Sequence, residues 1–87
     1  MGSEGGAVIG NLIDAAAQRL RAAGIIKPRR EANRLWAWQT RISTGQAWLD
    51  RERGAGAEAR AAFAEAVARR AAGEPLAYVL GAAGFRN

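Results

Sequence analysis

Large apolar residues recur every three to four positions along most of this chain, and glycine or proline stands where the pattern breaks. This spacing gathers the apolar side chains on one face of an α-helix, whereas a strand would need strict alternation. The predicted helices run from residue 8 to Gly24, from Pro28 through Ile42, over about 43–52, over about 57–72, and as a single turn over 75–81. The sequence therefore predicts an all-α fold, a small bundle of four to five helices.

Several residues mark the predicted helix ends. Gly24 and Gly73 each follow a helix at the position where a left-handed residue commonly stops it. Pro28 has the fixed φ that suits a first helical position. Ser43, with Gln46 three residues later, forms a capping box at the start of the third helix. The boundaries thus rest on local backbone chemistry as well as on apolar spacing.

A chain of 87 residues has room for a single hydrophobic core. Because 22 residues are alanine, which buries little area, a few large side chains must supply most of the burial, and stability should be modest. The predicted core consists of Ile9, Leu12, Ile13, Leu20, Leu35, Trp36, Ile42, Trp48, Leu49, Phe63, Val67, Leu76, Tyr78 and Leu80. We expect one domain at residues 8–81, after a glycine-rich tail at residues 1–7 that should be disordered.

Some positions leave alternatives open. Trp36 and Trp38 lie on opposite shoulders of the second helix's apolar stripe, so either both close the core or one docks another domain. Arg70 lies near the middle of the fourth helix's apolar face, where it either caps carbonyls while its stem covers the core, or needs a partner. Glu65 and Arg69 are available as an outward pair four residues apart. Ile25 and Ile26 should both pack under the turn at Gly24.

The composition excludes most catalytic chemistry. The chain has no cysteine and no histidine, so it lacks disulfides, thiolate or imidazole metal ligands, and a histidine general base. We therefore predict no catalytic and no metal-binding residue. No apolar run approaches the roughly 20 residues that span a bilayer, and the first residues lack the basic region of a signal peptide. We expect a cytoplasmic protein without a membrane partner.

The chain is basic, with a formal net charge of +5 and a pI near 11.3. Such a charge can indicate an acidic or nucleic-acid partner. Here the 12 arginines and one lysine are spread from Arg19 to Arg86 and mixed with eight acidic residues. We therefore favour a solvated or protein-facing surface and expect no nucleic-acid partner. The alternative is a free-standing basic helical bundle that binds nucleic acid or a protein.

The segment over residues 69–81, RRAAGEPLAYVLG, followed four residues later by Phe85, resembles a known junction. In the release factor glutamine methyltransferases, the family also called HemK or PrmC, a similar segment links an N-terminal helical domain to the methyltransferase domain. Upstream, the stop at Gly24, the opening at Pro28 and residues 32–37 are similar more loosely, so the resemblance covers nearly the whole chain beyond residue 7. Trp36 and Trp38 depart from it, because the family usually has aliphatic residues or histidine there.

The resemblance implies that the parent enzyme transfers a methyl group from S-adenosylmethionine to the glutamine of the Gly-Gly-Gln motif in peptide-chain release factors. This chain would be its N-terminal substrate-recognition domain, with residues 82–87 beginning the linker to a missing C-terminal methyltransferase domain. The sequence ends at Asn87, before the family's glycine-rich cofactor loop and its Asn-Pro-Pro-Tyr motif. We therefore expect no cofactor site in this chain, and no activity of the chain alone. The partners would be the release factor and the methyltransferase domain, and the chain should be a monomer.

The predicted contact residues are concentrated near the C-terminus. They are Arg69, Arg70, Glu74, Pro75, Leu76, Tyr78, Leu80, Gly81 and, on the second helix, Trp38. Pro75 locks φ at the start of a turn, the apolar residues after it are too dense for a free linker, and Gly81 permits a sharp exit. We expect this segment to set the angle between the two domains.

Overall fold

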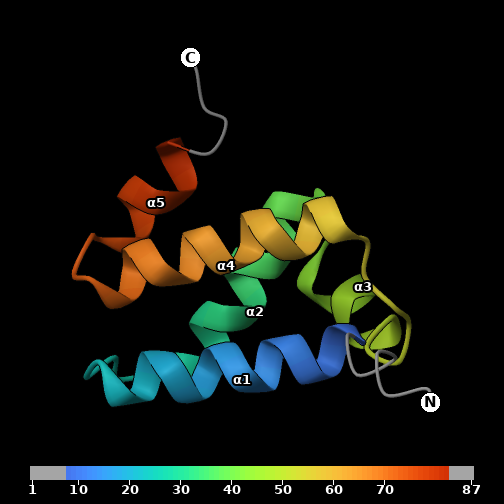
Figure 1. The fold of residues 1–87 in the computed structure, drawn as a ribbon, viewed down its shortest axis with the longest axis horizontal. Coiled ribbons are helices and arrows are strands. Elements are labelled where there is room, and N and C mark those ends of the chain that lie inside the picture. The colour runs from blue at the N-terminus through green and yellow to red at the C-terminus, as the bar shows by residue number, and fades with distance from the viewer. Residues whose placement is uncertain (1–7, 83–87) are drawn as a thin grey trace.

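The computed structural model describes residues 8–82, which form five helices: α1 (Ile9–Ala22), α2 (Pro28–Thr40), α3 (Thr44–Leu49), α4 (Ala57–Ala71) and α5 (Leu76–Ala82). In Figure 1, α1 and α4 lie next to each other, α2 passes behind them, and α5 lies beyond α4 on the side away from α1. No strand occurs in this range, so the all-α prediction is confirmed. The predicted tail at residues 1–7, and the linker apart from Ala82, lie outside the described residues.

Glycine ends two of the helices, as predicted. Gly24 has φ +92° and Gly73 has φ +112°, the left-handed region that side chains disfavour. At the first of these turns, the Ile25 N–H donates to the carbonyl of Leu20 and anchors Ile25 against the core. The prediction that Ile26 also packs there is wrong, because Ile26 is 89% exposed. Ile26 lies in the bend that leads into α2, where its side chain faces solvent.

α2 ends without a glycine. The helix stops at Thr40, earlier than the apolar register through Ile42 suggested, and Arg41 takes the left-handed conformation with φ 63°. The N–H of Ile42 then donates to the carbonyl of Ala37, and the Thr40 hydroxyl donates to the carbonyl of Trp36. These bonds satisfy the carbonyls that a helix end leaves free. The backbone of Arg41 is strained as a result, because a residue with a Cβ disfavours the left-handed conformation.

Replacing Arg41 with glycine should therefore stabilise the fold by about 0.5 to 1 kcal/mol, because glycine adopts this conformation without a Cβ clash. The midpoint of thermal unfolding, followed by circular dichroism, should rise by a few degrees. Arg60→Gly is the control, because Arg60 is an exposed arginine inside α4, where glycine should lower the midpoint. A lower midpoint for Arg41→Gly would mean that the arginine side chain contributes more than its strain costs.

α3 is shorter than predicted and ends at Leu49 rather than near Glu52. The Ser43 hydroxyl accepts the Gln46 N–H at 3.0 Å, which is one half of the predicted capping box. The other half is absent, because the Gln46 side chain donates to Asp50 instead. The chain then turns, so the apolar residues at the end of α3 leave the core.

The loop after α3 caps α1, whose own N-cap residue, Val8, offers no side-chain acceptor. The carbonyl of Arg53 accepts the Ile9 N–H at 2.9 Å, and that of Arg51 accepts the Gly10 N–H at 2.6 Å. A Cβ on residue 10 would lie 3.0 Å from the Arg51 carbonyl oxygen, so this close approach favours glycine. Backbone carbonyls of a loop distant in sequence thus replace a side-chain cap.

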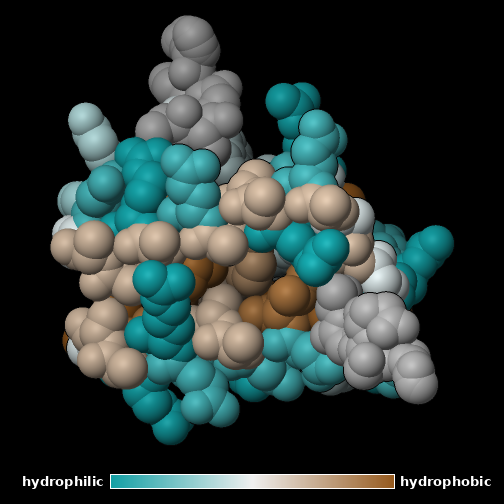
Figure 2. Space-filling view, in the orientation of Figure 1, coloured by the Kyte–Doolittle hydropathy of each residue, from teal (hydrophilic) through white to brown (hydrophobic). Residues whose placement is uncertain are grey.

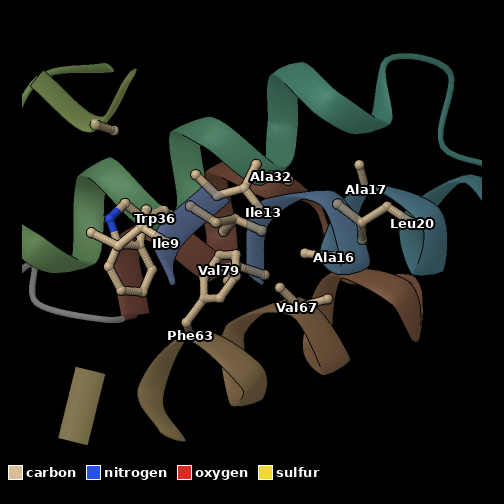
Figure 3. Close-up of a cluster of buried hydrophobic side chains, with 12 residues drawn as sticks. Ile9, Ile13, Ala16, Ala17, Leu20, Ala32, Trp36, Phe63, Val67 and Val79 are labelled. Carbon is tan, nitrogen blue, oxygen red and sulfur yellow. The ribbon is translucent and has the colours of Figure 1, made fainter. Parts of the chain in front are cut away.

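The core lies between α1, α2 and α4, and α5 closes it (Figure 3). The rings of Trp36 and Phe63 meet edge to face, with centroids 5.2 Å apart. The Trp36 indole N–H is buried and has no hydrogen-bond partner within residues 8–82. Of the predicted core residues, those that are buried are Ile9, Ile13, Leu20, Leu35, Trp36, Phe63 and Val67, and those partly buried against them are Leu12, Ile42, Leu76 and Leu80.

Three predicted core residues, Trp48, Leu49 and Tyr78, are wrong, because the structure exposes them. α3 is too short to bury more than Ala47, so its other apolar side chains face solvent. α5 is a continuous helix, which directs positions 76, 79 and 80 inward and position 78 outward. Val79, which was not predicted, is almost completely buried.

Candidate interface at the α4–α5 junction

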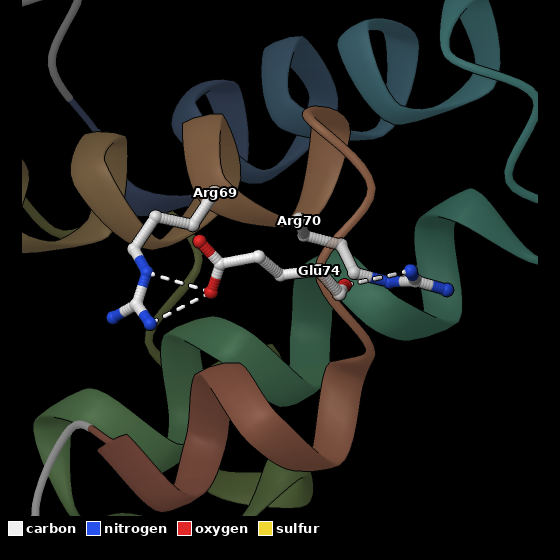
Figure 4. A network of polar contacts seen from close by, with 3 residues as sticks. All are labelled: Arg69, Arg70 and Glu74. Carbon is white, nitrogen blue, oxygen red and sulfur yellow. Dashed lines mark hydrogen bonds and ion pairs between the residues drawn. The ribbon is translucent and has the colours of Figure 1, made fainter.

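The turn between α4 and α5 is held by two neighbouring arginines that both bind Glu74 (Figure 4). Arg69 donates through Nε and Nη2 to one carboxylate oxygen of Glu74, at 3.0 and 2.7 Å. Arg70 donates through Nη1 to the backbone carbonyl of Glu74 at 2.9 Å. Side chain and backbone of the same residue are therefore fixed from two directions, directly before Pro75 restricts the chain again.

Arg70 also joins the end of α4 to the start of α2. Its Nε donates to Glu31 Oε1 at 2.6 Å and its Nη2 to Oε2 at 3.3 Å, in a two-pronged ion pair. Both side chains are only 18% exposed. Arg70 thus satisfies both open interpretations, because it caps a carbonyl and has a charged partner.

Both arginines at the junction keep their positive charge. The hydrogen bond to Glu31 raises the pKa of Arg70 above its ordinary value, although burial acts in the opposite direction. The hydrogen bond to Glu74 likewise raises the pKa of Arg69, with a smaller contribution from Glu65. A raised arginine pKa means that deprotonation of either arginine removes this stabilisation only in strong alkali. The network should therefore not vary with pH around neutrality.

The expected outward pair of Glu65 and Arg69 is not formed, because Arg69 binds Glu74 instead. Arg69 nevertheless lines a surface hollow between α2, α4 and α5. We call this hollow the Trp38 hollow; its lining residues are Trp38, Gln39, Arg41, Ala62, Glu65, Ala66, Arg69 and Val79. Trp38 is exposed there, whereas Trp36 is buried, so the interpretation that both tryptophans close the core is wrong. Docking of another domain by Trp38 stays a prediction.

Apart from Gly81, the predicted contact residues divide into three groups. Arg69, Arg70 and Glu74 form the network of the turn, and Leu76 and Leu80 pack partly against the core. Pro75 and Tyr78 are exposed, the latter to 66%, and Trp38 lies on α2 at the hollow. Gly81 lies within α5, which continues to Ala82, so the prediction that it closes a single turn is wrong. A helix with two turns points in a defined direction, which a single turn would not.

Sequence reasoning missed two residues at this site. Gln39 donates from its side chain to the carbonyl of Ala59 at 3.0 Å and ties α2 to α4. Val79 contributes to the floor of the Trp38 hollow. The helical spacing of positions 76, 79 and 80 is compatible with a buried Val79, but the alternation of positions 76, 78 and 80 fits this short segment equally well.

No group of three or more acidic side chains within residues 8–82 could hold a metal ion. None of the five helices is long and apolar enough to cross a membrane, in the range that the structure covers. Figure 2 shows apolar side chains at the floor of the gap between α1 and α4, bordered by paler apolar residues and by some polar side chains.

Comparison with known proteins identifies the family. The sequence profile of the PrmC N-terminal domain matches residues 11–81. The release factor glutamine methyltransferase of Rhodospirillum rubrum is 38% identical over 82 residues, which cover 94% of this chain. The chain spans about a quarter of the length of that relative (25%). No solved structure matches the chain significantly. Since the match covers most of the sequence, the chain belongs to the PrmC N-terminal domain family.

Proposed function

We propose that this chain is the N-terminal substrate-recognition domain of an S-adenosylmethionine-dependent methyltransferase, which methylates the glutamine of the Gly-Gly-Gln motif in peptide-chain release factors. Membership of the PrmC N-terminal domain family carries the proposal. A glutamine on a loop presents little sequence to read, so contacts far from the reacting amide supply affinity and orientation. A small helical domain with a rigid connection to the catalytic domain suits that task.

The α4–α5 junction supports the proposal because it fixes how α5 is placed against the rest of the bundle. Arg69 and Arg70 fix Glu74, and α5 then packs through Val79 against the core. A flexible tether would leave the recognised protein free to rotate relative to the active site. With α5 held rigidly, binding at the helical domain can restrict that rotation.

S-adenosylmethionine does not fit the described residues. In nucleotide-type cofactor sites, a glycine-rich turn between a strand and a helix places backbone N–H groups against the ligand. Residues 8–82 contain no strand and hence no such turn. The cofactor and the reacting amide would be held by the methyltransferase domain, so we derive no chemical step from this chain.

The alternative function, nucleic-acid binding, has less support. A phosphate-binding face needs cations without acidic neighbours. Within the described range, Arg29, Arg53, Arg69 and Arg70 are each paired with a carboxylate. Part of the basic charge, four of the 12 cationic side chains in residues 8–82, is therefore neutralised locally.

Tyr78→Ala tests the proposed function in the full-length enzyme. Tyr78 is exposed on α5, next to the connection, so we expect it to contact the methyltransferase domain and hold the two domains at a fixed angle. The substitution should raise the Michaelis constant for an intact release factor several-fold, since orientation of the bound protein would suffer. A short Gly-Gly-Gln peptide, which reaches no remote surface, should be methylated almost as well as before.

Trp48→Ala is the matched control, because Trp48 is an aromatic residue of α3 with a similar exposure of 62%. It should leave both substrates unaffected. Equal losses on protein and peptide for Tyr78→Ala would show that Tyr78 supports the active site directly. Unchanged kinetics on both substrates would contradict the proposed role of α5.

A further inference from the structure

An exposed apolar groove lies at the start of α2, on a part of the surface distinct from the Trp38 hollow. Its lining residues are Ile26, Lys27, Arg30, Glu31, Arg34 and Leu76, and we call it the Ile26 groove. Ile26 is 89% exposed, the largest exposed fraction among the large apolar residues that the structure describes. Leu76, the first residue of α5, is partly buried and lies at the same groove.

Three cationic side chains line the Ile26 groove beside its two apolar residues. Lys27, Arg30 and Arg34 follow one another at intervals of three and four residues, which places them on one face over about 10 Å of helix. None of them forms an ion pair within the part of the chain that the structure describes. Glu31, the acidic residue of the groove, already binds Arg70 with both oxygens. The three positive charges therefore repel one another in the free protein.

We infer that the Ile26 groove is the docking site for an acidic segment of the release factor, an inference that rests on the proposed function. A large apolar side chain of that segment would cover Ile26 and Leu76. Its carboxylates would meet Lys27, Arg30 and Arg34, where arginine can bind a carboxylate with two parallel hydrogen bonds. Charge complementarity at the rim would also speed encounter.

The groove favours a protein over a nucleic acid because its centre is apolar. Phosphate contacts would use the cations but would leave Ile26 uncovered. The groove also shares Glu31 and Leu76 with the structure around the α4–α5 junction, since Glu31 binds Arg70 and Leu76 opens α5. A partner seated there would be positioned relative to the connection that leads to the catalytic domain.

The test compares two double charge reversals in binding to the release factor, measured by titration calorimetry at about 0.15 M salt. Arg30→Glu with Arg34→Glu should weaken binding roughly tenfold or more, because both rim charges become repulsive. Arg21→Glu with Arg60→Glu is the matched control, on exposed positions of α1 and α4. Each arginine-to-glutamate substitution lowers the net charge by two units. Both double variants therefore have a formal net charge of +1 instead of +5. The control should change the affinity less than about threefold, and circular dichroism verifies that each variant is folded.

A second pair tests the apolar part of the groove. Ile26→Ser should weaken binding, whereas Leu49→Ser, at an exposed leucine of α3, should not. Equal losses in the two charge-reversed variants would mean that overall charge attracts the partner, which would overturn the groove as a docking site. Loss with the arginines but not with Ile26 would indicate a purely electrostatic contact and would also overturn it. Unaltered affinity in all variants would refute the groove alone, whereas a wild-type chain that does not bind the release factor would refute the proposed function as well.

Discussion

Phe63→Ala is expected to destabilise the fold by about 3 to 5 kcal/mol, because it removes a large aromatic side chain from the core. Phe63 is 4% exposed and packs edge to face against Trp36. Its neighbours include many alanines, which have no side-chain freedom to fill the cavity, so the core cannot collapse around it. A domain of this size has little stability in reserve. Most molecules should therefore be unfolded at 37 °C.

Urea denaturation followed by circular dichroism measures this effect, with the midpoint and slope compared against the wild-type chain. Leu49→Ala is the control, since it removes a large apolar side chain that is already exposed. It should change the free energy of unfolding by less than about 0.5 kcal/mol. A small loss for Phe63→Ala would mean that the core is loosely packed around the ring.

Arg70→Ala should destabilise the fold by about 1 to 3 kcal/mol. The substitution leaves Glu31, 18% exposed, without its partner and removes the donor to the Glu74 carbonyl. Loss of one partner of a fully buried pair costs about 3 to 5 kcal/mol, and the residual exposure of this pair reduces that figure. Arg29→Ala breaks the exposed pair with Asp14 and should cost less than about 1 kcal/mol.

A double replacement separates the charge from the packing. Arg70→Met with Glu31→Leu removes both charges and keeps apolar volume, so it should recover much of the stability that Arg70→Ala loses. The measurement is again chemical denaturation of each single variant and of the pair. If the double variant is as unstable as the sum of the two single ones, the ion pair itself contributes little, and the bond from Arg70 to the Glu74 carbonyl is the important contact.

The helices themselves were predictable because their signals are local. Apolar residues at three- and four-residue intervals, Gly24 and Gly73 at helix ends and Pro28 at a helix start act within a few residues of where they stand. The structure confirms each of these. The end of α2 was less predictable, since Arg41 adopts a conformation that glycine usually occupies.

The candidate site was only partly predictable. The sequence segment over residues 69–81 drew attention to the junction, but not to its contacts. Alternate apolar residues at 76, 78 and 80 suggested that Tyr78 is buried, whereas the helical register of α5 buries Val79 and exposes Tyr78. Sequence spacing could not choose between these patterns over so short a segment, because packing against α2 and α4 decides which face turns inward.

By itself, the sequence determined the fold class, the approximate positions of the helices and the family, because periodicity, capping and motif similarity are properties of neighbouring residues. Only the tertiary structure decided that Arg70 binds Glu31, a residue 39 positions away, and that the carbonyls of the loop after α3 cap α1. It also decided that Ile26 remains uncovered beside three unpaired cations. Such contacts depend on which helix faces meet in space, and the burial of the whole core fixes that choice.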